Sequence, residues 1–138
     1  MADQGLLFLC TGNSCRSQMA EGFANKYAGH EWEIFSAGLR PQGINPMAIR
    51  VMQEQGIDIT GQSSKSMETE EICKMDVIVT LCGGAREACP ITPPGIKRIH
   101  WPLTDPAQAT GSEEEILRVF RQVRDEIEER VQTFFSQQ

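Results

Sequence analysis

The sequence predicts a small α/β fold in which a doubly wound, four-stranded parallel sheet carries helices on both faces. Strand-like and helix-like segments alternate along all 138 residues. The near-continuous apolar runs at 6–9 and 76–81 are typical of parallel strands that are buried on both faces. No repeat, low-complexity tract or linker divides the chain, so residues 1–138 are expected to form one domain.

The expected elements are, in order, strand 6–9, helix 17–27, strand 32–37, a helix from Asn45 to near Gly56, an extended connector at 56–59, a short helix at 66–74, and strands at 76–81 and 97–101. Asn45 offers a capping side chain, and Pro46 suits the first position of the helix that follows. We expect Ile49 and Met52 to face inward on this helix.

A last helix is predicted near the C-terminus, where Ser112 and Glu115 form a capping box. Apolar residues then recur at helical spacing with charged residues between them, which predicts a stripe that packs on the core. The stripe consists of Ile116, Val119, Phe120, Val123, Ile127, Val131 and Phe134.

The clearest chemical signal follows the first strand, in the segment Cys10-Thr11-Gly12-Asn13-Ser14-Cys15-Arg16 and the next residue, Ser17. A strand-to-helix turn aims backbone N–H groups and the positive end of the helix at one point. Gly12 and Asn13 tolerate the unusual dihedral angles of such a turn, and the planar fork of Arg16 matches two oxygens of an oxyanion. We therefore expect Cys10 to be a thiolate nucleophile in an oxyanion-binding loop. The alternative is a buried cysteine followed by an ordinary capped helix.

The loops that follow the third and fourth strands should face Cys10, because parallel strands end at the same edge of a sheet. Asp105, in the second of these loops, is placed to act as a general acid that protonates a departing oxygen. Its alternative role is that of a turn aspartate before proline.

Cys82 and Cys89 flank a Gly83-Gly84 pair, which suggests a mobile dithiol rather than two unrelated packed thiols. If the residues from Gly84 to Cys89 are helical, the two thiols lie roughly 10 Å apart along the helix, whereas a disulfide needs α-carbons within about 4.4–6.8 Å. Disulfide formation would then unwind the segment. Zinc is the alternative, but the cysteine spacings fit no paired-ligand site, so no metal is expected.

The composition of the chain limits the expected cellular location and the expected binding partners. The first residues lack the features of a signal peptide, and no stretch of about 18 apolar residues occurs, so a cytoplasmic location is expected. A structural disulfide framework is not expected from five cysteines in that compartment. The net charge of −6 argues against nucleic acid and anionic membranes as partners.

Seven segments spread over nearly the whole chain carry a resemblance to a known family: 10–22, Ser36-Ala37-Gly38, Gly56-Ile57-Asp58-Ile59, Val79-Thr80-Leu81-Cys82-Gly83, Cys89-Pro90, His100-Trp101 and Asp105-Pro106. With these residues the chain resembles the thioredoxin-coupled arsenate reductases, which share the fold of the low-molecular-weight protein tyrosine phosphatases.

The resemblance implies that the protein takes part in arsenic detoxification, and that each candidate residue has a role in the reduction of arsenate. Cys10 would attack arsenate while Arg16 and the loop amides hold its oxygens. Ser17 would donate to the thiolate, and Asp105 would protonate the departing hydroxide.

The later steps that the resemblance implies form a relay of thiols. Cys82 would attack Cys10 and release arsenite, and Cys89 would attack Cys82 to leave a Cys82–Cys89 disulfide. Thioredoxin would reduce that disulfide, with no other cofactor. Asn13 would order the loop, and Cys15 and Cys73 would have no redox role, with Cys73 packed in the core from its helix.

One position departs from the pattern. Some members of the family bind potassium beside the loop through residues that correspond to Asn13, Glu21 and Ser36, together with an aspartate where this chain has Lys65. An ammonium group cannot ligate a cation and could replace it, although the other three residues could still form a weaker site.

Two other functions remain open. A tyrosine phosphatase would use Cys10, Arg16 and Asp105 alone, but aromatic residues usually follow its acid, whereas Ala107 and Gln108 follow here. Weak phosphatase activity is still expected, because phosphate and arsenate share shape and charge. A sensor that binds an oxyanion without turnover is the non-enzymatic alternative, and a turnover assay separates the three.

Overall fold

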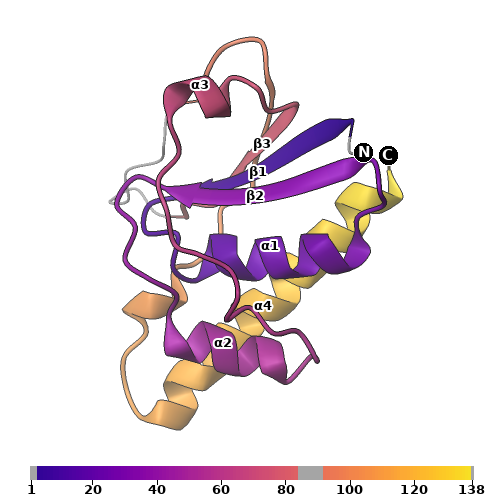
Figure 1. Cartoon of the computed structure of the whole chain (residues 1–138). Helices are drawn as coiled ribbons and strands as arrows, with labels where there is room; N and C mark the ends of the chain where they lie inside the picture. Colours follow the sequence, from indigo (N-terminus) through magenta and orange to yellow (C-terminus); the bar gives the residue numbers. More distant parts are fainter. Residues whose placement is uncertain (1–2, 84–91, 138) are drawn as a thin grey trace.

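The computed structural model describes residues 3–83 and 92–137, and in it four parallel strands form one sheet in the order β2-β1-β3-β4 (Figure 1). The strands are β1 (Gln4–Cys10), β2 (Trp32–Gly38), β3 (Val77–Thr80) and β4 (Lys97–His100). Because all the pairings are parallel, the carboxyl ends of the strands meet at one edge of the sheet. The predicted fold class is confirmed.

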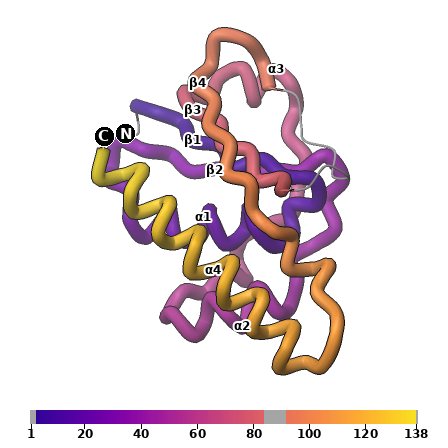
Figure 2. Tube along the Cα trace, turned by 180° about the vertical axis from the view of Figure 1, so that it is seen from behind, coloured from indigo at the N-terminus to yellow at the C-terminus, as the bar shows by residue number. Residues whose placement is uncertain are grey.

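Helices cover the two faces of the sheet unequally. The helices are α1 (Arg16–Tyr27), α2 (Pro46–Gln53), α3 (Thr69–Ile72) and α4 (Glu113–Ser136), with a 3-10 helix η1 at Pro106–Gln108. Figures 1 and 2 place α1, α2 and α4 on one face and α3 on the other. Among the described residues, no helix is both long and apolar enough to cross a membrane.

The alternation of side chains along β1 explains why its sequence is apolar without interruption. Leu6 and Phe8 pack in the larger core, under α1, α2 and α4, whereas Leu7 and Leu9 pack in the smaller core on the other face. Successive side chains of a strand point to opposite faces, so a strand covered on both sides needs apolar residues at every position.

The predicted helix at 66–74 is wrong in extent, because α3 begins at Thr69 and ends at Ile72. The preceding chain is held extended at Lys65, whose N–H donates to the Asn13 side chain and whose carbonyl accepts from the Gly38 N–H. Cys73, expected in the core, caps α3 and is exposed, since it lies past the end of this one-turn helix.

The start of α4 agrees with the sequence prediction, whereas its buried face differs in part from the predicted stripe. The capping box of Ser112 and Glu115 is confirmed at the start of α4. In the apolar stripe of that helix, Ile116 and Val119 are only half-buried, while Leu117, which the sequence did not single out, is 1 % exposed. α4 packs against both α1 and α2, and a helix with two neighbours buries more than a narrow stripe, so Leu117 also faces apolar surface.

An ionic network joins α2 to α4. The Glu54 carboxylate is 2.8 Å from Arg121 Nη2 and 2.7 Å from Arg124 Nη1, and the largely buried Arg124 also donates to the Val51 carbonyl. Hydrogen bonds from Arg121 and then Arg124 outweigh the cost of desolvation and lower the pKa of Glu54 to about 2. The charged form of Glu54 is therefore the stabilising form.

Replacing Glu54 with Gln should reduce the free energy of unfolding by about 1 kcal/mol at neutral pH, a modest value because the side chain is 33 % exposed. A carboxyl pKa that is lowered by folding stabilises the protein above the unfolded value near 4.5, and this contribution disappears as the pH falls toward about 2. Urea unfolding at a series of pH values measures the difference. Glu129→Gln, which removes an exposed carboxylate of α4, is the control. A difference that stays constant down to pH 2 would contradict the assignment.

Candidate active site

The sulfur of Cys10 lies at the carboxyl end of β1, where the chain turns into α1. Cys10 is 2 % exposed, and its Sγ accepts a hydrogen bond from the Asn13 N–H at 3.2 Å. The hydroxyl of Ser17, in the first turn of α1, is 2.9 Å from the same sulfur. Donors converge on the sulfur from the loop and from the helix, and such donors stabilise negative charge on it.

Asn13 fixes the direction of these hydrogen bonds. Its Oδ1 accepts from the Lys65 N–H at 2.8 Å, so the opposite side of the amide is the donor, and Nδ2 donates to Ser17 Oγ at 2.8 Å. Because Ser17 Oγ accepts there, its own proton is available to Cys10. Ser17 is therefore oriented as a donor to the sulfur.

The backbone of the turn is unusual at one residue rather than two. Asn13 has φ of 47°, a left-handed conformation that asparagine tolerates better than most residues. Gly12, expected to share this role, does not have positive φ. A Cβ at Gly12 would instead lie 3.3 Å from the side-chain oxygen of Gln42, so this glycine allows a close approach of the neighbouring chain.

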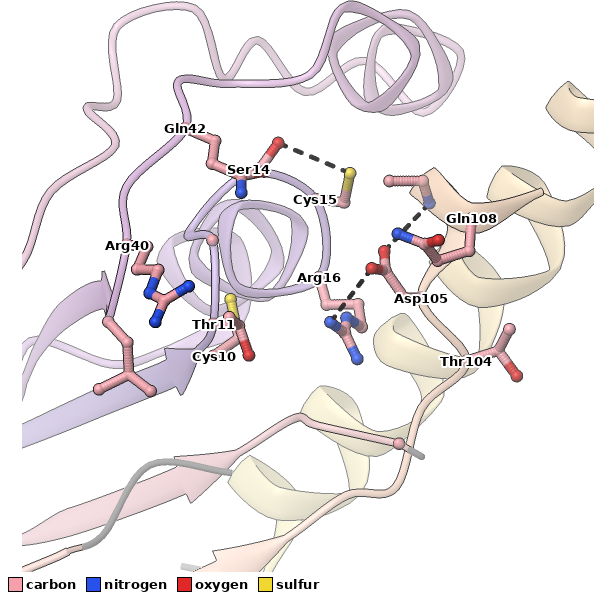
Figure 3. Close-up of a pocket in the computed structure, with 14 residues that line it drawn as sticks. Cys10, Thr11, Ser14, Cys15, Arg16, Arg40, Gln42, Thr104, Asp105 and Gln108 are labelled. Atoms are coloured by element: carbon pink, nitrogen blue, oxygen red, sulfur yellow. Dashed lines mark hydrogen bonds and ion pairs between the residues drawn. The ribbon is translucent and has the colours of Figure 1, made fainter. Parts of the chain in front are cut away.

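The second cysteine of the segment, Cys15, differs from Cys10 in its surroundings. It immediately precedes α1, and its Sγ lies 3.8 Å from Ser14 Oγ (Figure 3). Burial raises the pKa of the Cys15 thiol to about 12. Cys15 is therefore an un-ionised thiol at neutral pH, whereas a nucleophile must be a thiolate.

Arg16 links the segments that follow three strands. Its Nη1 donates to the carbonyl oxygens of Leu81, at 2.9 Å, and Leu103, at 3.1 Å, and its Nη2 is 3.7 Å from Asp105 Oδ2. A Cβ at Gly83 would lie 1.9 Å from the Leu103 oxygen, so only glycine allows these two segments to come so close.

Asp105 is anchored by its neighbours while remaining accessible. Its Oδ1 accepts from the Ala107 N–H at 3.0 Å and caps η1, which begins at Pro106. The side chain is 27 % exposed and lies beside Arg16 (Figure 3). The turn role and the position expected of a general acid are thus combined in one residue.

Cys10, Arg16 and Asp105 line one pocket of about 800 Å³. Its lining consists of Cys10, Thr11, Gly12, Ser14, Cys15, Arg16, Leu39, Arg40, Gln42, Gly83, Thr104, Asp105, Ala107 and Gln108. The loops after β3 and β4 therefore face Cys10, as the sequence predicts. Sequence reasoning missed the segment after β2, although its position at the same sheet edge was a usable signal.

Two glutamines that sequence reasoning also missed support the loop from behind. Gln18, which is fully buried, donates from Nε2 to the Asn13 carbonyl and to the Ser63 carbonyl, both at 3.0 Å. Gln62 donates to the Gln18 side chain at 2.8 Å. Buried amides of this kind are satisfied only while the chains around 13 and 63 stay in place.

The described cysteines differ in whether they are free or disulfide-bonded. Cys10, Cys15 and Cys73 are free thiols, whereas Cys82 is 4 % exposed and disulfide-bonded. Cys89, predicted as the resolving cysteine, lies outside the described residues, as do Gly84 and the predicted helical turn between them.

The three residues that the sequence raised as potassium ligands take part in hydrogen bonds of the protein. The Asn13 amide is used on both sides, and Ser36 Oγ donates to the Glu21 carboxylate. Lys65, the residue that departs from the family pattern, donates from Nζ to the Ser63 carbonyl at 3.3 Å. In residues 3–83 and 92–137, no group of three or more His, Cys, Asp or Glu side chains could hold a metal ion.

The fold and this loop define a protein class. The family model described as "Low molecular weight phosphotyrosine protein phosphatase" matches residues 5–138, and the chain belongs to that family. Within it, the chain is 54 % identical to an arsenate reductase of Halalkalibacterium halodurans. The 129 residues compared make up 94 % of this chain and 93 % of the relative.

Solved structures agree with this grouping. An arsenate reductase in the phosphate-binding state is 36 % identical, with a TM-score of 0.78 and coverage of 97 % of this chain and 98 % of the other. A thioredoxin-dependent arsenate reductase of Corynebacterium glutamicum is 27 % identical, with a TM-score of 0.64 and coverage of 96 % and 64 %.

Gly38→Ala should weaken the binding of inorganic phosphate by about tenfold or more. A Cβ at Gly38 would lie 2.7 Å from the Asn13 nitrogen and 2.8 Å from the Thr11 oxygen, so the loop backbone has to move. Titration calorimetry measures the affinity, and circular dichroism checks the fold. Gly61→Ala is the matched control, because a Cβ there meets nothing within 4 Å. Equal affinities of the two variants would show that the loop tolerates the added methyl group.

Proposed function

We propose that this protein reduces arsenate to arsenite through Cys10, Cys82 and Cys89, and that thioredoxin returns it to the dithiol state. The observation that carries the proposal is the Cys10 sulfur, which receives two hydrogen bonds at the base of a pocket shared with Arg16 and Asp105. The names of the similar arsenate reductases support the choice of arsenate as the oxyanion.

In the first step the Cys10 thiolate attacks the arsenic atom and forms a sulfur–arsenic bond. Loop N–H groups and the Arg16 guanidinium hold the oxygens, which is an anion-binding arrangement. One arsenic–oxygen bond breaks, and Asp105 transfers its proton to the departing hydroxide, which leaves as water. The position of Asp105 at the pocket, held by the Ala107 N–H, supports this role.

In the second step the Cys82 thiolate attacks Cys10 Sγ. The electron pair of the Cys82 thiolate forms the new sulfur–sulfur bond, while the sulfur–arsenic bond breaks and its electron pair stays on arsenic, which is reduced from the +5 to the +3 state. Cys89 then attacks Cys82, which releases Cys10 as a thiolate and leaves a Cys82–Cys89 disulfide. The bonded state of Cys82, together with the free thiols at Cys10, Cys15 and Cys73, supports this end point.

The reductant in this scheme is a protein dithiol, and no other cofactor takes part. The thioredoxin-dependent relative from Corynebacterium glutamicum supports thioredoxin as the partner. A protein that turns over arsenate with a thioredoxin system would serve arsenic detoxification in the cytoplasm.

A weak phosphatase activity is expected beside the reduction. The first step needs only Cys10, Arg16 and Asp105, and phosphate esters present the same tetrahedral anion. None of the described residues that line the pocket is aromatic, so nothing there clamps a phenyl ring. This lining favours arsenate reduction over hydrolysis of tyrosine phosphate.

The proposal is tested by arsenate-dependent oxidation of NADPH in the presence of thioredoxin and thioredoxin reductase. The unmutated protein should turn over, and Cys10→Ser should lose both arsenate reduction and aryl phosphate hydrolysis. Cys15→Ser is the matched control, because Cys15 is un-ionised at neutral pH, and this variant should still turn over arsenate. Turnover of either substrate by Cys10→Ser would remove Cys10 from the role of nucleophile.

The relay itself is tested by Cys89→Ser. This variant should keep phosphatase activity but stop after a single turnover with arsenate, since it cannot release Cys10 from the Cys10–Cys82 disulfide. Peptide mass mapping identifies that disulfide, and Cys73→Ser, which changes an exposed thiol outside the relay, is the control. Sustained turnover by Cys89→Ser with thioredoxin as the only reductant would rule out the relay.

A further inference from the structure

A second guanidinium, that of Arg40, lies at the pocket, and the proposed chemistry does not use it. Arg40 is exposed and lines the pocket together with Cys10 and Thr11. In Figure 3 its side chain extends toward these two residues, on the side of the pocket opposite Asp105. Arg16 and Arg40 therefore line the same pocket as Cys10 from different segments of the chain.

The backbone holds Arg40 against the loop. The Leu39 N–H donates to the Cys10 carbonyl at 3.3 Å, and the Arg40 N–H donates to the Thr11 carbonyl at 2.8 Å. The Gln42 N–H donates to the Gly12 carbonyl at 3.0 Å. These bonds continue the pairing of β1 with β2 beyond the sheet edge, so the position of the Arg40 backbone follows that of the loop.

The charge of Arg40 is available to an anion. In residues 3–83 and 92–137 no carboxylate lies within ion-pair distance of Arg40, whereas Arg50 and Arg121, for example, are paired with glutamates. Arg16, in contrast, donates from Nη1 to two carbonyl groups, and its Nη2 lies 3.7 Å from the Asp105 carboxylate. An unpaired guanidinium at the pocket of a chain with net charge −6 provides local attraction for an oxyanion.

We propose that Arg40 is a substrate-binding residue that captures the arsenate anion at the mouth of the pocket and holds it beside Arg16. This inference rests on the proposed arsenate chemistry for its substrate. A multiply charged oxyanion that enters beside a thiolate meets more negative charge than Arg16 alone can balance, and a guanidinium offers the planar fork that matches two of its oxygens. Arg40 acts before the chemical step, so its effect belongs to KM rather than kcat.

The test compares Arg40→Gln, Arg40→Lys and the control Arg118→Gln, which removes an exposed arginine of α4 outside the pocket lining. Arg40→Gln should raise the KM for arsenate about three- to tenfold with kcat nearly unchanged. It should also flatten the fall of kcat/KM with ionic strength, because screening weakens the attraction that the variant lacks. Arg40→Lys should restore the salt dependence and part of the affinity, and Arg118→Gln should match the unmutated protein.

Binding of inorganic phosphate, measured by titration calorimetry, tests Arg40 without any turnover. It should weaken in Arg40→Gln by the same factor as KM. Equal phosphate affinity and equal KM for Arg40→Gln and the unmutated protein would overturn the inference while leaving arsenate reduction intact. A fall in kcat at constant KM would also overturn it, since the residue would then act in the chemical step. Absence of arsenate turnover in the unmutated protein, with phosphate binding still dependent on Arg40, would contradict the proposed function instead.

Discussion

The hydrogen bonds of one side chain, that of Asn13, hold the loop around Cys10 in its shape. The amide accepts from the Lys65 N–H and donates to Ser17, which leaves the Ser17 hydroxyl to donate to Cys10. The Asn13 N–H also donates to the Cys10 sulfur, from a left-handed backbone. Both the direction of the donors and the curvature of the loop therefore depend on this buried residue.

Close approaches of the backbone at two glycines bring other segments to the loop. Gly38 lets the end of β2 contact the loop, and Gly83 lets the chain after β3 contact Leu103. Arg16 then bridges the carbonyls of Leu81 and Leu103. A thiol relay that starts at Cys10 and continues to Cys82 needs these segments to share one pocket, and small residues at the contacts are the physical means of bringing them together.

The helices α2 and α4 help to position the edge of the sheet at which the strands end. The Glu54 network fixes α4 against α2, and η1, which leads toward α4, carries the Asp105 cap at its start. Figure 2 shows the chain after β4 passing the end of the sheet on its way to α4. Asp105, the proposed acid, is thus placed by the connection between β4 and α4, while Cys10, the proposed nucleophile, is placed by β1.

By itself the sequence determined the fold class, the turn of the loop around Cys10 and the facing position of Asp105. The fold class and the loop depend on local patterns, such as apolar strand runs, a capping box, and cysteine and arginine at a fixed spacing in one turn, and the position of Asp105 follows from the parallel direction of the strands. Only the tertiary structure decided the length of α3, the exposure of Cys73 and the place of Arg40. The tertiary structure also showed that Asn13 has a positive φ and that Gly12 does not. Such features arise from contacts between segments far apart in the chain, and contacts of that kind leave no periodic signal in the residues that make them.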